Sequence, residues 1–260
     1  MFTKFASSLS TLIRCDQPTP SLSVGSCQYV ANKQIEDRVS FGETRNGFFF
    51  MTVLDGHGGF QLADHLSKRL PQLFAEKIDN HLTDQKSLMN EMFLQADSEW
   101  LDFVRPMYLA GFTGPIKVGA CAVAVAIGTD SIVVGSVGDC RCVLASKNGA
   151  ISDLNIERNA NLESEQSRLR ALHPNEEDVI KCKRSWQEES EVPGGWFSKK
   201  SMITKYSGCY VKGRLQPTKS FGDFHLKHES VGFDPERNRT FLDPTTPKSF
   251  PYIDAVPDVT

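Results

Sequence analysis

The 260-residue sequence has little excess of charge of either sign, and this absence excludes two classes of partner. Its 29 lysines and arginines are matched by 32 aspartates and glutamates, which leaves a formal net charge of −3. A nucleic-acid interface or a sensor of anionic membranes needs a basic excess, so we expect no nucleic-acid partner. The longest apolar stretch, Val118 to Gly128, is about half of the ~20 residues that a membrane-spanning helix requires. We therefore also expect no membrane span.

The sequence lacks the cysteine spacing of a disulfide framework or a zinc site. Its seven cysteines form no C-x-x-C pair and no closely spaced even-numbered set. This pattern favours a cytoplasmic or other reducing intracellular compartment. Residues 1–15 contain two basic residues, five Ser or Thr and no acidic residue, which is typical of a weak mitochondrial transit peptide. A mitochondrial location is therefore the alternative.

What is present is enough apolar sequence for one large core, arranged in blocks of strands and helices. Residues 48–54 form a continuous apolar run that stops at Asp55-Gly56, as a buried strand followed by a turn does. Leucines at helical spacing predict a helix over 60–74, and a second helix is expected over 88–106. Residues 120–127 and 131–137 predict a β-hairpin.

Blocks of like elements, rather than strict alternation, indicate an α+β fold. We expect residues 1–24 to be a leader or extension and residues 25–260 to form a single domain. Residues 186–209 contain Pro193, Gly194, Gly195 and Gly208 and show little periodicity, so a long surface loop or flap is predicted there.

Three acidic elements stand at the edges of predicted strands: Glu36-Asp37, Asp55 and Asp139. Carboxylates gathered at strand ends form a hard oxygen site suited to Mg²⁺ or Mn²⁺. Two such ions can clamp a phosphoryl group and generate a hydroxide nucleophile. Any one of these elements taken alone is explained by an ordinary turn or cap, and only their combination favours a metal site.

The combination includes four motifs in a fixed order. These are Ile-Glu-Asp-Arg at 35–38, Asp-Gly-His-Gly-Gly at 55–59, Val-Gly-Asp-Cys-Arg at 137–141 and Gly-Arg-Leu-Gln-Pro-Thr-Lys-Ser-Phe-Gly-Asp at 213–223. Together they resemble the metal-dependent Ser/Thr protein phosphatases of the type 2C family, from about residue 25 to 260. The Asn-x-x-x-Glu-Asp-Arg arrangement and the last motif look most like the pyruvate dehydrogenase phosphatase branch.

The resemblance implies a two-sheet antiparallel β-sandwich flanked by helix pairs, in α-β-β-α layers, with two metal ions at one end. It implies hydrolysis of phosphoserine and phosphothreonine esters in phosphoproteins by a metal-activated water. In this sequence, Glu36, Asp55 and the Gly56 carbonyl would hold one Mg²⁺ or Mn²⁺, which Asp37 would reach through water. Asp55 would bridge to the second ion, and Asp139 matches the acidic residue of a third, weakly held metal.

The same resemblance implies the remaining site residues. His57 matches the general acid that protonates the leaving oxygen, so His57 and Asp55 are the expected catalytic residues. Many family members carry a phosphate-binding Arg four residues before the Glu; this chain has Asn32 there, with Lys33 beside it. The pyruvate dehydrogenase phosphatase branch also lacks that Arg, so Asn32 and Lys33 are weak candidates for contact with the substrate phosphate.

One departure from the family pattern opens two hypotheses. The family has two further metal aspartates, in an Asp-Gly and an Asp-Asn element, and no aspartate after Asp223 is followed by Gly or Asn. We therefore expect a sandwich that lacks the C-terminal portion of the family domain and has one incomplete metal site. The chain is then either a phosphatase whose final portion lies outside the sequence, or a catalytically inactive relative. The second hypothesis predicts a binding or structural subunit with a protein partner covering the truncated sandwich edge.

Overall fold

A computed structural model describes residues 22–30, 34–44, 47–80, 84–188, 202–246 and 248–260, and its centre is one antiparallel sheet. The strand order is β1-β2-β3-β4-β12, and β9 pairs with the first two residues of β3, Gly119 and Ala120. The strands are β1 (Arg38–Glu43), β2 (Phe49–His57), β3 (Gly119–Ile127), β4 (Ile132–Val137), β9 (Phe221–Gly222) and β12 (Asp258–Val259). The expected leader over residues 1–24 lies outside the described residues apart from its last three.

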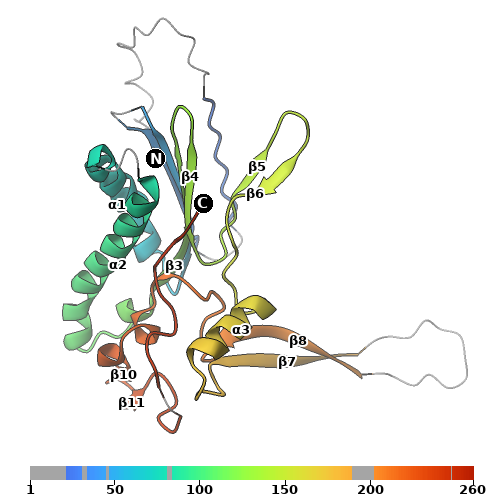
Figure 1. Cartoon of the computed structure of the whole chain (residues 1–260). Helices are drawn as coiled ribbons and strands as arrows, with labels where there is room; N and C mark the ends of the chain where they lie inside the picture. The colour runs from blue at the N-terminus through green and yellow to red at the C-terminus, as the bar shows by residue number, and fades with distance from the viewer. Residues whose placement is uncertain (1–21, 31–33, 45–46, 81–83, 189–201, 247) are drawn as a thin grey trace, which may run out of the picture.

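Two long helices, α1 (Gln61–Lys77) and α2 (Gln85–Leu109), cover one face of this sheet (Figure 1). The predicted leucine spacing is confirmed, because the side chains at 62, 66, 70 and 73 are all fully buried. The second predicted helix continues past Pro106, where its end had been placed. Proline removes only one backbone hydrogen bond, and the buried side chains of Trp100 and Val104 hold the preceding turn in place.

The central strand β3 is buried along nearly its whole length because both of its faces are covered. Its alanines belong to the same apolar cluster as the helices, whereas Val123 and Val125 pack with Val134 on the opposite face. Small side chains toward the helices let the helix backbones approach the sheet closely. The antiparallel pairing of β3 with β4 confirms the predicted hairpin, with Ile127 opposite Ile132 across its turn.

A second region is built on α3 (Glu163–Leu172) and the hairpin of β7 (Ile180–Glu188) and β8 (Met202–Val211). The predicted flap over 186–209 is therefore wrong in part, since residues 186–188 and 202–209 are strand; residues 189–201 lie outside the described residues. The turn-forming Pro and Gly residues at 193–195 indicated a loop for the whole range, although Gly208 lies in a strand beside an irregularity in the ladder.

Among the described residues, the shorter elements are two small hairpins and four 3₁₀ turns. They are β5 (Val143–Ala145) with β6 (Ile151–Asp153), β10 (Phe233–Asp234) with β11 (Arg239–Thr240), Ile78–Asn80, Pro115–Lys117, Phe224–Leu226 and Glu229–Val231. The α+β class and the antiparallel pairing are as predicted. No helix within the described ranges is long and apolar enough to cross a bilayer.

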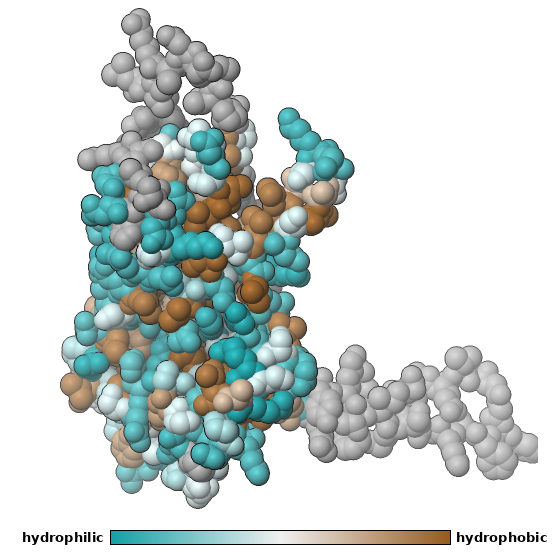
Figure 2. Space-filling model, viewed as in Figure 1, coloured by the Kyte–Doolittle hydropathy of each residue, from teal (hydrophilic) through white to brown (hydrophobic). Residues whose placement is uncertain are grey.

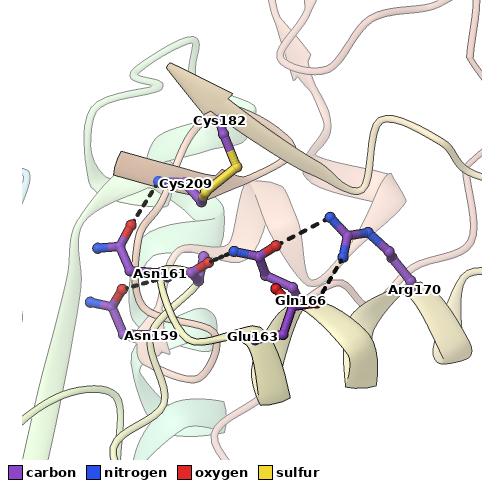
Figure 3. Close-up of a disulfide and its surroundings, with 8 residues drawn as sticks. Asn159, Asn161, Glu163, Gln166, Arg170, Cys182 and Cys209 are labelled. Carbon is purple, nitrogen blue, oxygen red and sulfur yellow. Dashed lines mark hydrogen bonds and ion pairs between the residues drawn. A yellow bond between two sulfur atoms is a disulfide. The ribbon is translucent and has the colours of Figure 1, made fainter. Parts of the chain in front are cut away.

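The cysteine spacing did not indicate the disulfide between Cys182 and Cys209, which are directly opposite each other on β7 and β8. Figure 3 shows that this disulfide lies beside the start of α3, where Asn161 accepts a hydrogen bond from the Cys209 backbone N–H at 2.7 Å. The disulfide thus links the two strands of the hairpin, and the Asn161 side chain joins the hairpin to the segment leading into α3 through a hydrogen bond. The predicted intracellular location stays a prediction.

Candidate active site

The sheet topology brings the C-terminal ends of β2 and β4 to the same end of the sheet. Because β2 and β4 are both antiparallel to β3, they run in the same direction. Asp55, near the end of β2, is opposite Cys121 of β3. Val137, the last residue of β4, is opposite Ala122, and Asp139 follows two residues later. The two aspartates therefore lie on either side of β3 at one edge of the sheet.

The third predicted acidic element joins them through the β1–β2 pairing. Arg38, the first residue of β1, is opposite Leu54, so Asp37 lies beside Asp55. Burial, the negative charges of Asp37 and Asp139, and a hydrogen bond shared with Asp37 raise the pKa of Asp55 above its usual range, while the nearby His57 opposes the shift. The structure thus brings three of the predicted carboxylates together, and their mutual repulsion favours a bound cation.

Glu36 meets this group through its backbone, because β2 passes directly beside it. A Cβ atom built at Gly56 would lie 2.5 Å from the Glu36 carbonyl oxygen, a separation that real side chains do not adopt. The glycine of the Asp-Gly-His motif is therefore required for the close approach of β2 to residue 36. The expected roles of Glu36 and of the Gly56 carbonyl as metal ligands stay predictions.

A cavity of about 600 Å³ opens at this edge of the sheet. Asp37, Asp55, Cys140 and Arg141 line it together with β1, β2 and the extended segment 24–29. Burial, with the charges of Asp55 and Asp139, raises the pKa of the Cys140 thiol to about 12. Cys140 is therefore a protonated thiol at neutral pH, so it does not act as a thiolate nucleophile.

The carboxylates provide the chemistry of a Mg²⁺ or Mn²⁺ site, but only part of its ligands. Oxygen donors are what these ions prefer, and Asp37 with Asp55 provides two carboxylates in contact. Asp139 accepts a hydrogen bond from Asn159 Nδ2 at 2.7 Å. Across the described part of the chain, no group of three or more His, Cys, Asp or Glu side chains is arranged to hold a metal ion. The donor types fit the metal, and the donor count is incomplete.

His57, the predicted general acid, is held by a residue to which the sequence assigned no role. Its Nε2 lies 2.7 Å from Oδ2 of Asp223, whose side chain is 2% exposed. Burial disfavours the imidazolium, but the charge and hydrogen bond of Asp223 and the charge of Asp55 raise the pKa of His57 above its usual 6.5. Asp223 ends the fourth sequence motif, which was the only signal that marked it. Asn32 and Lys33, the weak phosphate candidates, lie outside the described residues.

The chain is similar to known proteins over most of its length. The family described as Protein phosphatase 2C matches residues 26–260. Probable protein phosphatase 2C 67 of Arabidopsis thaliana is 29% identical over 81% of this chain and 51% of its own length. Probable protein phosphatase 2C 43 of Oryza sativa subsp. japonica is 24% identical over 88% of this chain and 53% of its own length. The chain thus spans about half the length of these curated relatives.

A solved structure shares the fold. It is described as a sex-determining protein of C. elegans, it superposes with a TM-score of 0.56, and it is 18% identical. The match covers 88% of this chain and 45% of that chain. At this level of identity the likeness concerns the fold alone, and it agrees with the α+β arrangement described above.

Proposed function

Because the chain belongs to the protein phosphatase 2C family, we propose that it is a metal-dependent phosphatase that hydrolyses phosphoserine and phosphothreonine esters of a phosphoprotein. The observation that carries the proposal is the grouping of Asp37, Asp55 and Asp139 beside the cavity that Asp37 and Asp55 line, with His57 two residues after Asp55 on the same strand. When bound, Mg²⁺ or Mn²⁺ would polarise the phosphoryl oxygens and lower the pKa of a coordinated water.

The residues of this chain supply the other requirements of the reaction. Asp37 and Asp55 would give carboxylate oxygens to the cation, with the charge of Asp139 nearby, and the cation would offset the repulsion that helps to raise the pKa of Asp55. The 600 Å³ cavity admits the phosphorylated segment of the substrate. His57 is one-quarter exposed and adjacent to the carboxylates, where a general acid for the leaving oxygen is needed. The segment 215–223 and the position of Asn32 favour the pyruvate dehydrogenase phosphatase branch.

A second candidate function is that of an inactive family member that binds a protein partner. Two observations favour it: the incomplete donor group described above and apolar side chains left on the sheet face opposite the helices. Phe41 is 48% and Val53 49% exposed on that face, and Ile151 on the β5–β6 hairpin is 74% exposed. Figure 2 shows hydrophobic residues gathered on this hairpin and on the part of the molecule beside it. A partner covering these residues would bury apolar area.

Two measurements on the same purified chain distinguish these functions. Mn²⁺ binding is followed by electron paramagnetic resonance, and Mn²⁺-dependent phosphate release is followed with a phosphoserine peptide. We expect Asp55→Asn to lower both, turnover by more than about 100-fold, whereas Asp130→Asn, exposed at the opposite end of the sheet, leaves both unchanged. Mn²⁺ binding without turnover by the wild-type chain would support the inactive relative. Turnover unaffected by Asp55→Asn would refute the carboxylate site.

A further inference from the structure

The contact between His57 and Asp223 joins two residues that are 166 positions apart in the sequence. The Asp223 carboxylate has a second partner, since Ser220 Oγ donates a hydrogen bond to the same oxygen, Oδ2, at 2.8 Å. Ser220 is fully buried. The carboxylate is therefore held from one side by its own loop and presents its oxygen to the imidazole on the other side.

The backbone around the pair is shaped to permit this contact. Asp223 adopts a left-handed conformation with φ of +49°, which is uncommon for residues other than glycine, although Asp and Asn tolerate it. Its backbone N–H is bonded to the Val118 carbonyl at 3.1 Å. This strained conformation directs the carboxylate toward the end of β2.

Gly119 leaves the space in which the hydrogen bond forms. It is opposite His57 in the β2–β3 ladder and opposite Gly222 in the β3–β9 ladder. A Cβ atom at position 119 would overlap both His57 Nε2 and Asp223 Oδ2. A glycine stands between the two side chains because any larger residue at position 119 would occupy the space of their hydrogen bond.

We propose that Asp223 is the positioning residue of His57: it holds the imidazole with Nε2 toward its carboxylate and leaves Nδ1 as the nitrogen that serves the substrate. A buried carboxylate beside one ring nitrogen selects the tautomer that carries a proton there, and it restricts rotation of the ring. The role in catalysis rests on the proposed phosphatase function. The orientation of the ring does not, because it follows from the contact itself.

The proton transfer that this arrangement supports is balanced within the site. Water attacks phosphorus as the bond to the serine or threonine oxygen breaks, and the electron pair of that bond passes to the leaving oxygen. His57 Nδ1 gives its proton to this oxygen, the alcohol departs, and the ring returns to neutrality. Asp223 keeps the Nε2 proton in place throughout. The phosphate retains the hydroxyl derived from water, the second proton of that water passes to solvent, and a proton from solvent restores Nδ1.

The ring orientation is tested by nuclear magnetic resonance on the full chain labelled with ¹⁵N-histidine, at one alkaline pH. The wild-type spectrum should show a proton bonded to His57 Nε2. In Asp223→Asn, an amide N–H can donate to Nε2 instead, and the fraction of rings with an Nε2 proton should fall at least about twofold. Asn tolerates the left-handed backbone of residue 223, so this variant should retain the fold. Asp234→Asn, at a buried aspartate outside the pair, is the matched control and should leave the His57 signals unchanged.

The catalytic consequence is tested with two substrates that differ in their need for a proton donor. A phosphoserine peptide has a poor leaving group and should lose about 10²- to 10⁴-fold in kcat in Asp223→Asn. p-Nitrophenyl phosphate has a leaving group that departs without protonation and should lose less than about tenfold. Equal losses on both substrates would assign Asp223 a merely structural role and overturn the proposal.

A third variant breaks the contact from the backbone. Gly119→Ala leaves both side chains of the pair unchanged, and we expect it to lower the fraction of rings with an Nε2 proton as Asp223→Asn does. If Gly119→Ala does not fold, Asp223→Asn decides alone. An unchanged fraction of rings with an Nε2 proton in a folded Asp223→Asn overturns the proposal. If the wild-type chain turns over neither substrate, the proposed function fails, and the resonance spectra still decide the role of Asp223.

Discussion

The main-sheet region and the α3 region bury different kinds of side chain. The first comprises the central sheet with α1 and α2, and its core is a continuous apolar cluster from Phe50 to Ala255. The second comprises α3, the β7–β8 hairpin and the loops packed on them, and it buries Glu165, Glu176 and Lys212 beside a smaller apolar cluster. The comparison teaches that one chain uses two sources of stability: removal of apolar surface from water, and ion pairs that are stable only as complete sets.

The buried charges of the α3 region are joined in networks. Glu165, whose side chain is 2% exposed, accepts hydrogen bonds from Arg158, from Arg168 at 2.7 Å and from Thr218. Burial alone would raise the pKa of Glu165, but the hydrogen bonds from Arg168, Thr218 and Arg158 outweigh it and lower the pKa to about 2. Lys212 is equally enclosed, between Glu176 and Asp178.

Glu165→Gln tests the comparison most strongly. It removes one charge, so that Arg168 loses its carboxylate partner and Arg158 keeps only Asp258, and we expect a loss of about 3–5 kcal/mol in the free energy of unfolding. Urea titration followed by circular dichroism measures it. Glu163→Gln is the matched control on the same helix: its side chain is 83% exposed, and a change within about 0.5 kcal/mol is expected. Similar small losses for both variants would contradict the network.

Leu66→Ala makes the corresponding change in the main-sheet region. Leu66 is fully buried between α1 and the sheet, and truncation should cost about 2–5 kcal/mol through lost burial and a residual cavity. The loss should be nearly independent of pH, because no charge is removed. Leu94→Ala, at a half-exposed leucine on α2, should cost less than about 1 kcal/mol. A loss for Leu66→Ala as small as that of the control would mean that this core is loosely packed.

Removal of the disulfide tests whether the α3 region also depends on a covalent constraint. The bond joins residues 27 positions apart, and the double change Cys182→Ser and Cys209→Ser should cost about 2–4 kcal/mol, largely by releasing the unfolded chain. The loss should fall on the β7–β8 hairpin in hydrogen exchange and leave β3 protected. Cys142→Ser, at a free and partly buried cysteine, is the control. Equal loss of protection in β3 would mean that the two regions unfold as one unit.

Lowering the pH tests the buried charge of Glu165 in the α3 region, and it should give the smallest of these effects on stability. The folded-state pKa of Glu165, about 2, lies below its unfolded value of about 4.3, so its contribution to stability is complete above pH ~4.3 and is lost as the pH falls toward ~2. Wild-type stability should fall over this window by up to about 1.4 kcal/mol per pH unit from this group. Glu165→Gln should flatten the slope when unfolding is measured at several acidic pH values. An unchanged slope would show that the charge of Glu165 is not coupled to folding.

Local sequence patterns predicted much of the main-sheet region and little of the α3 region. The apolar run before Asp55, the leucines of α1 and the turn between β3 and β4 each act over a few residues, so periodicity was sufficient. The β7–β8 hairpin was not predicted, because the proline and glycines at 193–195 indicated a loop over the whole of residues 186–209. The pairing of the two strands outweighs this local signal. Glu165 and Lys212 are charged residues of a kind that usually lies on the surface, and only their ion-pair partners explain their burial.

For the candidate site as well, local sequence predicted one part and tertiary contacts decided the other. The sequence by itself determined which acidic residues lie at the ends of strands and that His57 is two positions after Asp55, since both are properties of neighbouring positions. Only the tertiary structure decided that Asp37 and Asp139 converge on Asp55, because that depends on the strand order β1-β2-β3-β4. The Asp223 contact with His57 likewise depends on the pairing of β9 with β3 and on the missing side chain at Gly119. Contacts between distant positions form where strands pair, and composition or local spacing does not specify that register.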